Sequence, residues 1–226
     1  AATLAYQDEQ LGRVMAELER MGELEGTMVV IVQGDNGASG EAGHHGTINE
    51  LRGMGAHDED PAWMLANMER LGGDQTYGNY PVGWAWAMNT PLRWTKQFAS
   101  MLGGIRNGMI LAWPGRVAKP GSVCGEFSHL IDIYPTVLEA SGLSAPRMVQ
   151  GAVQKPVDGK SLMPSLAQCQ PDRTRTQYFE IGGKVGLYHD GWFLSGDDGR
   201  VPWEGLPPEG ERPTMRWGLY NLGADY

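Results

Sequence analysis

The sequence predicts an α/β fold that is followed by a small antiparallel β region. An amphipathic helical pattern over residues 4–21 precedes an apolar strand over 27–33, and a glycine-rich loop follows that strand directly. A helix, a buried strand and a loop at the carboxyl end of the strand make up one α/β unit. Short strand patterns separated by Gly and Asp then occupy residues 177–226. We expect an α/β core over residues 1–143 and a β-rich subdomain over residues 144–226.

The first helix and strand follow from the spacing of apolar residues. Val and Ile fill positions 29–32, which is typical of a strand covered on both faces, as in a parallel sheet. Helices often end at a glycine, so the first helix is expected to end at Gly22. Its apolar residues recur at helical spacing, and they are Leu11, Val14, Met15, Leu18 and Met21.

Segments after the first strand show further helix and strand patterns. Pro135 lies inside a helical pattern, and its ring requires a helix start or a kink near Asp132. Pro114 ends a second apolar strand. The expected elements are a helix over 61–71, a strand over 109–113, a helix over 128–141 and short strands over 178–181, 186–188 and 191–194.

The composition limits the possible partners. The 226 residues carry a formal net charge of −9, with a pI near 5.0. Nucleic acids and anionic membranes are bound by clustered Lys and Arg, so this charge argues against both. No stretch approaches the roughly 20 apolar residues of a membrane span. An anionic small substrate stays possible, because a divalent metal ion makes a pocket locally positive.

The two cysteines form no metal-binding motif. Cys124 and Cys169 lie far apart in the sequence, and neither belongs to a CxxC pair. We expect two buried or idle thiols, and a single disulfide bond is the alternative.

The turn after the first strand is the strongest chemical signal in the chain. Gly34-Asp35-Asn36-Gly37 presents a carboxylate and an amide oxygen at a strand end, and hard cations bind such oxygens. The alternative is a plain turn, because Asp, Asn and Gly all suit turn backbones. His44 and His45 follow in the next loop, but without a third ligand at suitable spacing they do not predict a transition-metal site.

Six segments of the sequence resemble the sulfatases of the arylsulfatase type, within the alkaline-phosphatase-like superfamily. They occur in the order of that family and span almost the whole chain, so the set is far more specific than any one of them. The segments are residues 27–41 (TMVVIVQGDNGASGE), 46–50 (GTINE), 83–97 (GWAWAMNTPLRWTKQ), 103–108 (GGIRNG), 129–139 (HLIDIYPTVLE) and 219–222 (LYNL).

The resemblance implies a fold, a chemistry and three site residues. The fold would be the C-terminal portion of an alkaline-phosphatase-like α/β domain. Sulfatases hydrolyse sulfate esters with a formylglycine nucleophile and a divalent cation, usually Ca²⁺. The strand-end pair of that family maps onto Asp35 and Asn36 as metal ligands, and its sulfate-binding lysine maps onto Lys96. A compact ammonium suits a tetrahedral oxyanion, and it can assist the leaving oxygen as charge develops there.

The sequence also departs from the family pattern. The Cys/Ser-x-Pro/Ala-x-Arg signature, which yields formylglycine, does not occur upstream of the Asp35-Asn36 turn in these residues. Many relatives carry His where this chain has Met101. We therefore expect a C-terminal fragment, inactive alone, whose nucleophile lies upstream. The expected parent is a sulfuric ester hydrolase, and a small-molecule sulfate ester is its expected partner. The alternatives are a phosphatase or phosphonate monoester hydrolase of the same superfamily, or a non-catalytic binding module derived from a sulfatase.

Overall fold

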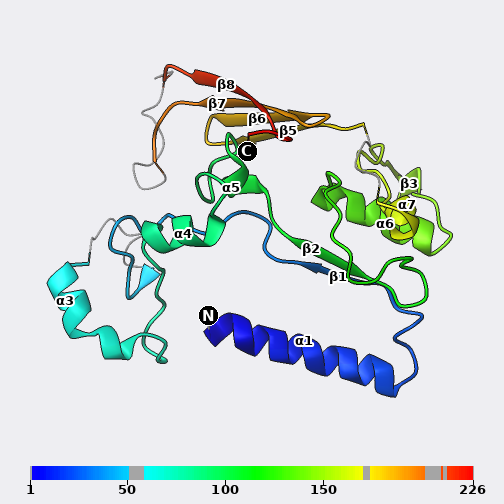
Figure 1. The fold of residues 1–226 in the computed structure, drawn as a ribbon, viewed down its shortest axis with the longest axis horizontal. Helices are drawn as coiled ribbons and strands as arrows, with labels where there is room; N and C mark the ends of the chain where they lie inside the picture. The colour runs from blue at the N-terminus through cyan, green and yellow to red at the C-terminus, as the bar shows by residue number, and fades with distance from the viewer. Residues whose placement is uncertain (1, 51–58, 170–173, 202–209, 211–212, 226) are drawn as a thin grey trace. The chain divides into compact units, whose positions relative to one another are not determined.

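The chain folds into two compact units, each built from two separate stretches of sequence. A computed structural model describes residues 2–50, 59–169, 174–201, 210 and 213–225 (Figure 1). The first unit contains residues 1–33 and 109–173, and the second contains residues 34–108 and 174–226. The boundary that the sequence suggests between residues 143 and 144 stays a prediction.

The first unit contains the predicted apolar strands, but their direction differs from the prediction. Strand β1 (Val29–Val32) pairs with β2 (Met109–Ala112) in antiparallel register, so that Val29 lies opposite Ala112. The expectation of a parallel arrangement is therefore wrong for this pair. All four residues of β1 are half-buried, and their continuous Val and Ile content carries no information about the direction of the neighbouring strand.

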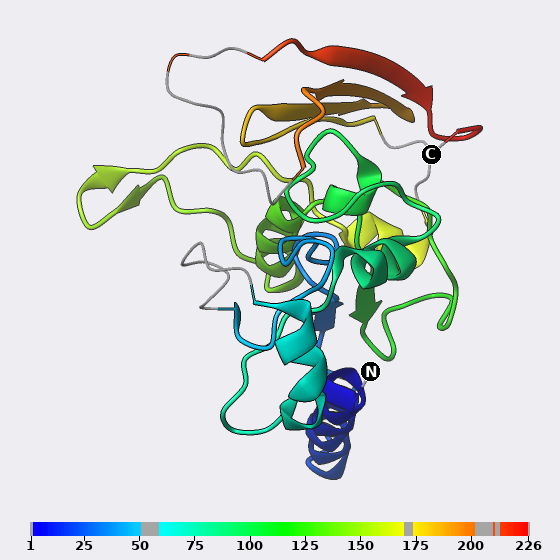
Figure 2. The same cartoon turned by 90° about the vertical axis from the view of Figure 1, so that its left-hand side faces the viewer.

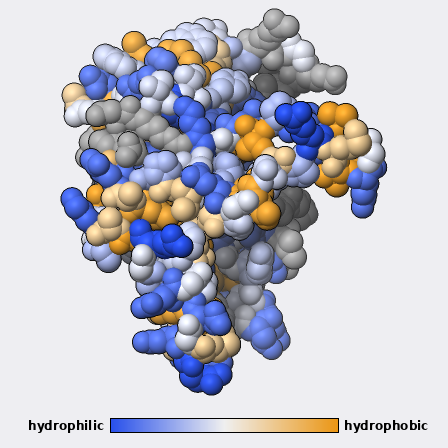
Figure 3. Space-filling view, turned by 90° about the vertical axis from the view of Figure 1, so that its right-hand side faces the viewer, coloured by the Kyte–Doolittle hydropathy of each residue, from blue (hydrophilic) through white to orange (hydrophobic). Residues whose placement is uncertain are grey.

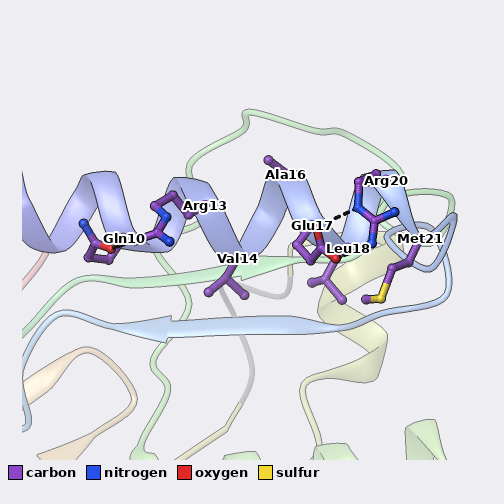
Figure 4. Close-up of a pocket in the computed structure, with 8 residues that line it drawn as sticks. All are labelled: Gln10, Arg13, Val14, Ala16, Glu17, Leu18, Arg20 and Met21. Carbon is purple, nitrogen blue, oxygen red and sulfur yellow. Dashed lines mark hydrogen bonds and ion pairs between the residues drawn. The ribbon is translucent and has the colours of Figure 1, made fainter.

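Helix α1 (Ala2–Arg20) confirms the predicted amphipathic helix and its end. Gly22 adopts a φ of +75°, the left-handed conformation that commonly follows a helix. Val14, Leu18 and Met21 extend from the side of α1 that faces β1 and β2 (Figure 4). No residue of the described helix is fully buried.

Of the helix start or kink predicted near Asp132, the first unit shows a helix start. A 3₁₀ turn, η2 (Leu130–Asp132), leads directly into helix α6 (Ile133–Ala140). The Asp132 carboxylate is buried and accepts hydrogen bonds from the backbone N–H groups of His129 (2.9 Å) and Lys160 (2.8 Å). It therefore caps the turn and ties the following loop to it. The unit also contains β3 (Met148–Val149), β4 (Ala152–Val153) and α7 (Met163–Ala167).

Cys124 and Cys169 form a disulfide bond, with their Cα atoms 5.6 Å apart. The prediction of two thiols is wrong, and the alternative is the arrangement found. The cause is tertiary: Ala118 donates a backbone hydrogen bond to Leu166 O (2.9 Å), and Ser165 Oγ donates to Glu126 Oε2 (2.5 Å). These contacts bring α7 against the 118–126 segment, although 45 residues separate the cysteines.

The second unit contains short helices and one antiparallel sheet, whose strands β5 to β8 appear together in Figures 1 and 2. The strand order is β5-β6-β7-β8. The predicted antiparallel strands are confirmed, and the last strand was not predicted. The elements are α3 (Pro61–Ala66), η1 (Met68–Arg70), α4 (Val82–Asn89), α5 (Leu102–Ile105), β5 (Thr176–Ile181), β6 (Lys184–His189), β7 (Trp192–Asp197) and β8 (Arg216–Asn221).

One face of this sheet packs against the segment 98–100. Phe98 is 1% exposed and Ser100 is fully buried. The Ser100 hydroxyl donates to Asp197 Oδ2 (2.7 Å), and the Lys184 ammonium lies 4.8 Å from the centroid of the Phe98 ring. A Cβ atom on Gly186 would lie 2.3 Å from Ala99 O, so the strand approaches this segment backbone to backbone.

Asp198 should make the stability of the protein sensitive to acid. Its side chain is 1% exposed and lies 2.6 Å from Lys184 Nζ. Burial alone would raise the pKa of Asp198, but hydrogen bonds from Lys184 and Arg200 lower it from 3.8 to about 2. The interactions of the Asp198 carboxylate with Lys184 and Arg200 therefore add about 2 kcal/mol to the free energy of unfolding. This contribution is fully present above about pH 4 and is lost as the pH falls towards 2.

Urea unfolding at several pH values, followed by tryptophan fluorescence, measures this contribution. Asp198→Asn should flatten the loss of stability below about pH 4, because the folded and unfolded states of the variant no longer differ in that proton. Asp8→Asn, on the exposed surface of α1, serves as the matched control. An unchanged pH profile in Asp198→Asn would contradict the assignment.

In the part of the chain that the structure describes, no helix is both long and apolar enough to cross a membrane. On the face drawn in Figure 3, apolar surface is broken up by polar surface.

Candidate active site

The predicted metal ligands lie in a tight turn at the start of the second unit. Asp35 is exposed and Asn36 is half-buried. Asn36 Nδ2 donates to Asp35 Oδ1 (2.5 Å), which aligns the two side chains. Gly34 adopts a φ of +85°, a conformation that glycine takes without a steric penalty. The turn thus presents the carboxylate of Asp35 and the amide of Asn36 side by side.

Glycines hold this turn directly against the end of the lysine loop, which we define as residues 93–104. The Gly37 N–H donates to Gly104 O (2.9 Å). A Cβ atom on Gly37 would lie 1.6 Å from Gly103 O, so no side chain fits between the two backbones. The metal-ligand turn and the lysine loop are therefore in direct backbone contact, although they lie far apart in the sequence.

Asn89, the last residue of α4, links the metal-ligand turn and the lysine loop through hydrogen bonds of its side chain. Its Oδ1 accepts from the backbone N–H of Ala38 (3.1 Å). Its Nδ2 donates to Trp94 O (2.8 Å) and Gly103 O (2.8 Å). One amide therefore satisfies three backbone groups, which belong to the turn and to both ends of the lysine loop.

Asn89→Asp should destabilise the protein by about 3 kcal/mol, because the variant keeps the acceptor for Ala38 but loses both donors to carbonyl groups. The new carboxylate would also face the carbonyl oxygens of Trp94 and Gly103. The free energy of unfolding in urea measures the effect. Asn107→Asp makes the same chemical change at an exposed position and should shift stability by less than about 0.5 kcal/mol. Equal losses in both variants would refute a specific role for Asn89.

Lys96 lies between two residues with left-handed backbone conformations. Trp94 has a φ of 66° and Gln97 a φ of 74°, and neither is glycine. Such conformations cost on the order of 1 kcal/mol or more and persist only where surrounding contacts impose them. Trp94 is fixed by stacking on Phe98, with ring centroids 4.3 Å apart, and the Lys96 N–H donates to Ala38 O (3.0 Å). The fold therefore holds Lys96 in a constrained loop.

The Lys96 ammonium forms an ion pair with Glu41. Lys96 Nζ lies 2.8 Å from Glu41 Oε2, and the side chains are 39% and 26% exposed. The hydrogen bond that Lys96 donates to Glu41 is the main cause that raises the pKa of Lys96, and the charges of Glu41, Glu50 and Asp35 act in the same direction. Burial would raise the pKa of Glu41, but the Lys96 hydrogen bond and charge outweigh it and lower that pKa. Lys96 is therefore cationic at neutral pH.

The structure brings the predicted site residues into one neighbourhood. Lys96 bonds to Ala38, two residues after Asn36, and the charge of Asp35 acts on its ammonium. Sequence reasoning missed Glu41 and Asn89, although both lie within the family-like segments. Their only sequence signal is that position, because Lys96 lies 55 residues from Glu41 and Ala38 lies 51 residues from Asn89.

The donor chemistry of the turn suits a hard cation, but it is only part of a coordination shell. A carboxylate and an amide supply oxygen ligands of the kind that Ca²⁺ binds, and Ca²⁺ takes 6–8 of them. Within residues 2–50, 59–169, 174–201, 210 and 213–225, no group of three or more His, Cys, Asp or Glu side chains could hold a metal ion. His44 and His45 are exposed and belong to no such group among these residues.

Known proteins resemble this chain over most or all of its length. The sulfatase family model matches residues 1–143. An uncharacterized sulfatase of Schizosaccharomyces pombe is 28% identical over 228 residues, which cover 100% of this chain and 38% of that protein. The steryl-sulfatase of Mus musculus is 28% identical over 159 residues, which cover 70% of this chain and 18% of that protein. The chain thus spans well under half of the length of either relative.

A solved structure of a protein in complex with its substrate, D-glucosamine-2-N,6-O-disulfate, shares the fold. The TM-score is 0.55 at 18% identity, over 99% of this chain and 33% of the other. This likeness confirms the predicted α/β fold of the alkaline-phosphatase-like type with an antiparallel sheet. The family match covers more than half of the residues. The chain belongs to the sulfatase family.

Proposed function

We propose that this chain is the C-terminal part of a metal-dependent sulfuric ester hydrolase, in which Asp35, Asn36 and Lys96 act on a small-molecule sulfate ester. One observation carries the proposal. Lys96 lies in a strained loop whose backbone contacts the backbone of the turn that presents the oxygen ligands Asp35 and Asn36. Strain of this kind is concentrated at functional sites. The family membership supplies the sulfate ester as the substrate class.

Each residue has a defined role in this proposal. Asp35 and Asn36 would hold Ca²⁺, which supplies Lewis-acid polarisation of a sulfate oxygen when bound. Lys96 would bind another sulfate oxygen as a point charge, and it would donate a proton or hydrogen bond to the bridging oxygen as the ester bond breaks. Glu41 favours this protonated form, since its hydrogen bond raises the pKa of Lys96.

The remainder of the site is proposed to lie outside these residues. No Cys/Ser-x-Pro/Ala-x-Arg sequence precedes the Asp35-Asn36 turn, and the one match to that spacing, residues 169–173, begins at Cys169, whose sulfur is bonded to Cys124. The described part of the chain offers only an incomplete metal site. We propose that an upstream segment supplies a formylglycine and the other metal ligands. We use the term complete protein for the chain together with that segment. Residues 1–226 alone are then expected to be inactive.

The test compares residues 1–226 with the complete protein on 4-nitrophenyl sulfate and 4-nitrophenyl phosphate, with and without Ca²⁺ after chelation. We expect sulfate hydrolysis only by the complete protein, and only with the metal. A preference for the phosphate ester would establish the phosphatase alternative. Turnover by residues 1–226 alone would refute the division of the site.

A second candidate, a non-catalytic binding module, is favoured by Met101. Met101 stands at the N-terminus of α5, beside the lysine loop, where many relatives carry a polar His. A thioether cannot replace the hydrogen bond of an imidazole. Absence of the formylglycine signature from the upstream coding sequence would support this candidate, and Met101→His would then restore no activity.

A further inference from the structure

We propose that Glu41 is a specificity-determining residue, which makes the site favour monoanionic sulfate esters over dianionic phosphate monoesters. The inference rests on the proposed role of Lys96 as the residue that binds the ester anion. It goes beyond that role, because it assigns the discrimination between two ester classes to a carboxylate that forms an ion pair with the lysine.

Glu41 is fixed in place by contacts from three side chains. Its Oε2 accepts hydrogen bonds from Lys96 Nζ (2.8 Å) and Ser39 Oγ (3.1 Å), and its Oε1 accepts one from Gln97 Nε2. Ser39 Oγ in turn accepts from Asn79 Nδ2 (3.1 Å). The Glu41 side chain is 26% exposed, and its carboxylate accepts hydrogen bonds from two consecutive residues of the lysine loop, Lys96 and Gln97. It cannot turn away from Lys96 without breaking all three contacts.

Negative charge therefore surrounds the anion-binding cation. Glu41 contacts the ammonium directly, and Glu50 and Asp35 also act on it through their charges. An ester oxygen bound to Lys96 Nζ at ordinary hydrogen-bond length would lie about 4–6 Å from Glu41 Oε2. At that separation, two unit charges near a protein surface interact strongly enough to change binding severalfold or more.

The two ester classes differ in the charge that they bring to this position. A sulfate monoester carries one negative charge, and a phosphate monoester carries nearly two above its second pKa of about 6. The repulsion from Glu41 therefore weighs more heavily on the phosphate ester. With the partial exposure of the pair, we expect Glu41 to contribute about tenfold to the preference for sulfate.

A purely structural role for Glu41 makes a different prediction. If the carboxylate only oriented Lys96, its replacement would impair sulfate and phosphate esters by the same factor. The ratio of the two kcat/KM values separates these roles, because any common loss of lysine orientation cancels in that ratio.

The experiment compares wild type and Glu41→Gln in the complete protein on 4-nitrophenyl sulfate and 4-nitrophenyl phosphate, above the second pKa of the phosphate. We expect the ratio of sulfate to phosphate kcat/KM to fall about tenfold in Glu41→Gln. Calorimetric binding of methanesulfonate and methylphosphonate, which have the same shape but different charge, provides a readout independent of turnover. Above the second pKa of methylphosphonate, Glu41→Gln should lower the preference for methanesulfonate by the same factor. Below that pKa both ligands are monoanions, and the substitution should leave the preference unchanged.

Two further variants keep the inference falsifiable. Glu69→Gln removes an exposed carboxylate in η1 and should leave the ratio unchanged. Glu41→Asp keeps the charge and should keep the sulfate preference, even if Glu41→Gln does not fold. If wild type hydrolyses the sulfate ester and both Glu41 variants keep its ratio, the inference is overturned while the proposed function stands. Absence of sulfate hydrolysis by wild type overturns the function itself.

Discussion

Replacing Lys96 with alanine is expected to lower kcat/KM of the complete protein for an aryl sulfate by about a thousandfold. The variant loses a positioned cation at the sulfate and the donor that neutralises the leaving oxygen, and each such effect is worth about 10²–10⁴. Steady-state kinetics on 4-nitrophenyl sulfate measure the loss. Lys155→Ala, which removes an exposed lysine in the other unit, should retain full activity.

The leaving group distinguishes the two contributions of Lys96. An alkoxide needs a proton or hydrogen bond more than a phenolate does, so Lys96→Ala should impair an alkyl sulfate more than an aryl sulfate. Lys96→Arg keeps the charge but presents a planar fork in place of a compact ammonium, and it should recover only part of the activity. Equal losses for alkyl and aryl esters would leave Lys96 with anion binding alone.

Asp35→Ala should lower activity by about a thousandfold and should weaken Ca²⁺ binding by at least about a hundredfold. It deletes a charged ligand, and even the loss of an outer-shell partner of a metal ligand costs about 10–100-fold in affinity or activity. Calorimetric titration of the complete protein with Ca²⁺, after chelation, measures the binding directly. High Ca²⁺ should restore part of the activity if the loss reflects occupancy.

Asp74→Ala provides the control, because Asp74 is an exposed aspartate in the same unit. It should leave both Ca²⁺ affinity and turnover unchanged. Wild-type Ca²⁺ affinity in Asp35→Ala would show that the turn is a structural element, which is the plain-turn alternative for this motif.

Local sequence patterns predicted the elements that depend on nearby residues. The helix over 4–21 and its end at Gly22 follow from apolar spacing and from one glycine, and the helix start after Asp132 follows from one proline. The direction of β1 relative to β2 did not follow, because an apolar run reports burial only. Strand β8 was not predicted, and its pairing with β7 is a tertiary contact.

The site residues likewise divide into those that a local sequence motif indicates and those that only tertiary contacts reveal. The sequence suggested Asp35, Asn36 and Lys96 because each lies in a motif that resembles the sulfatases, and their roles stay predictions. Glu41 and Asn89 could not be assigned roles, because the contacts of Glu41 with Lys96 and of Asn89 with Ala38 join residues more than 50 positions apart. Such contacts depend on tertiary folding, which local propensity does not encode.

The disulfide bond of the first unit affects how this protein would respond to a protease. Cys124 and Cys169 enclose the hairpin of β3 and β4, where Met148 is 61% exposed and Val153 is 78% exposed. Exposed hairpin tips are common sites of proteolytic nicking. A single cut there would leave the two polypeptide fragments covalently joined. A nicked molecule would therefore keep its full mass on a gel until a reducing agent separated the pieces.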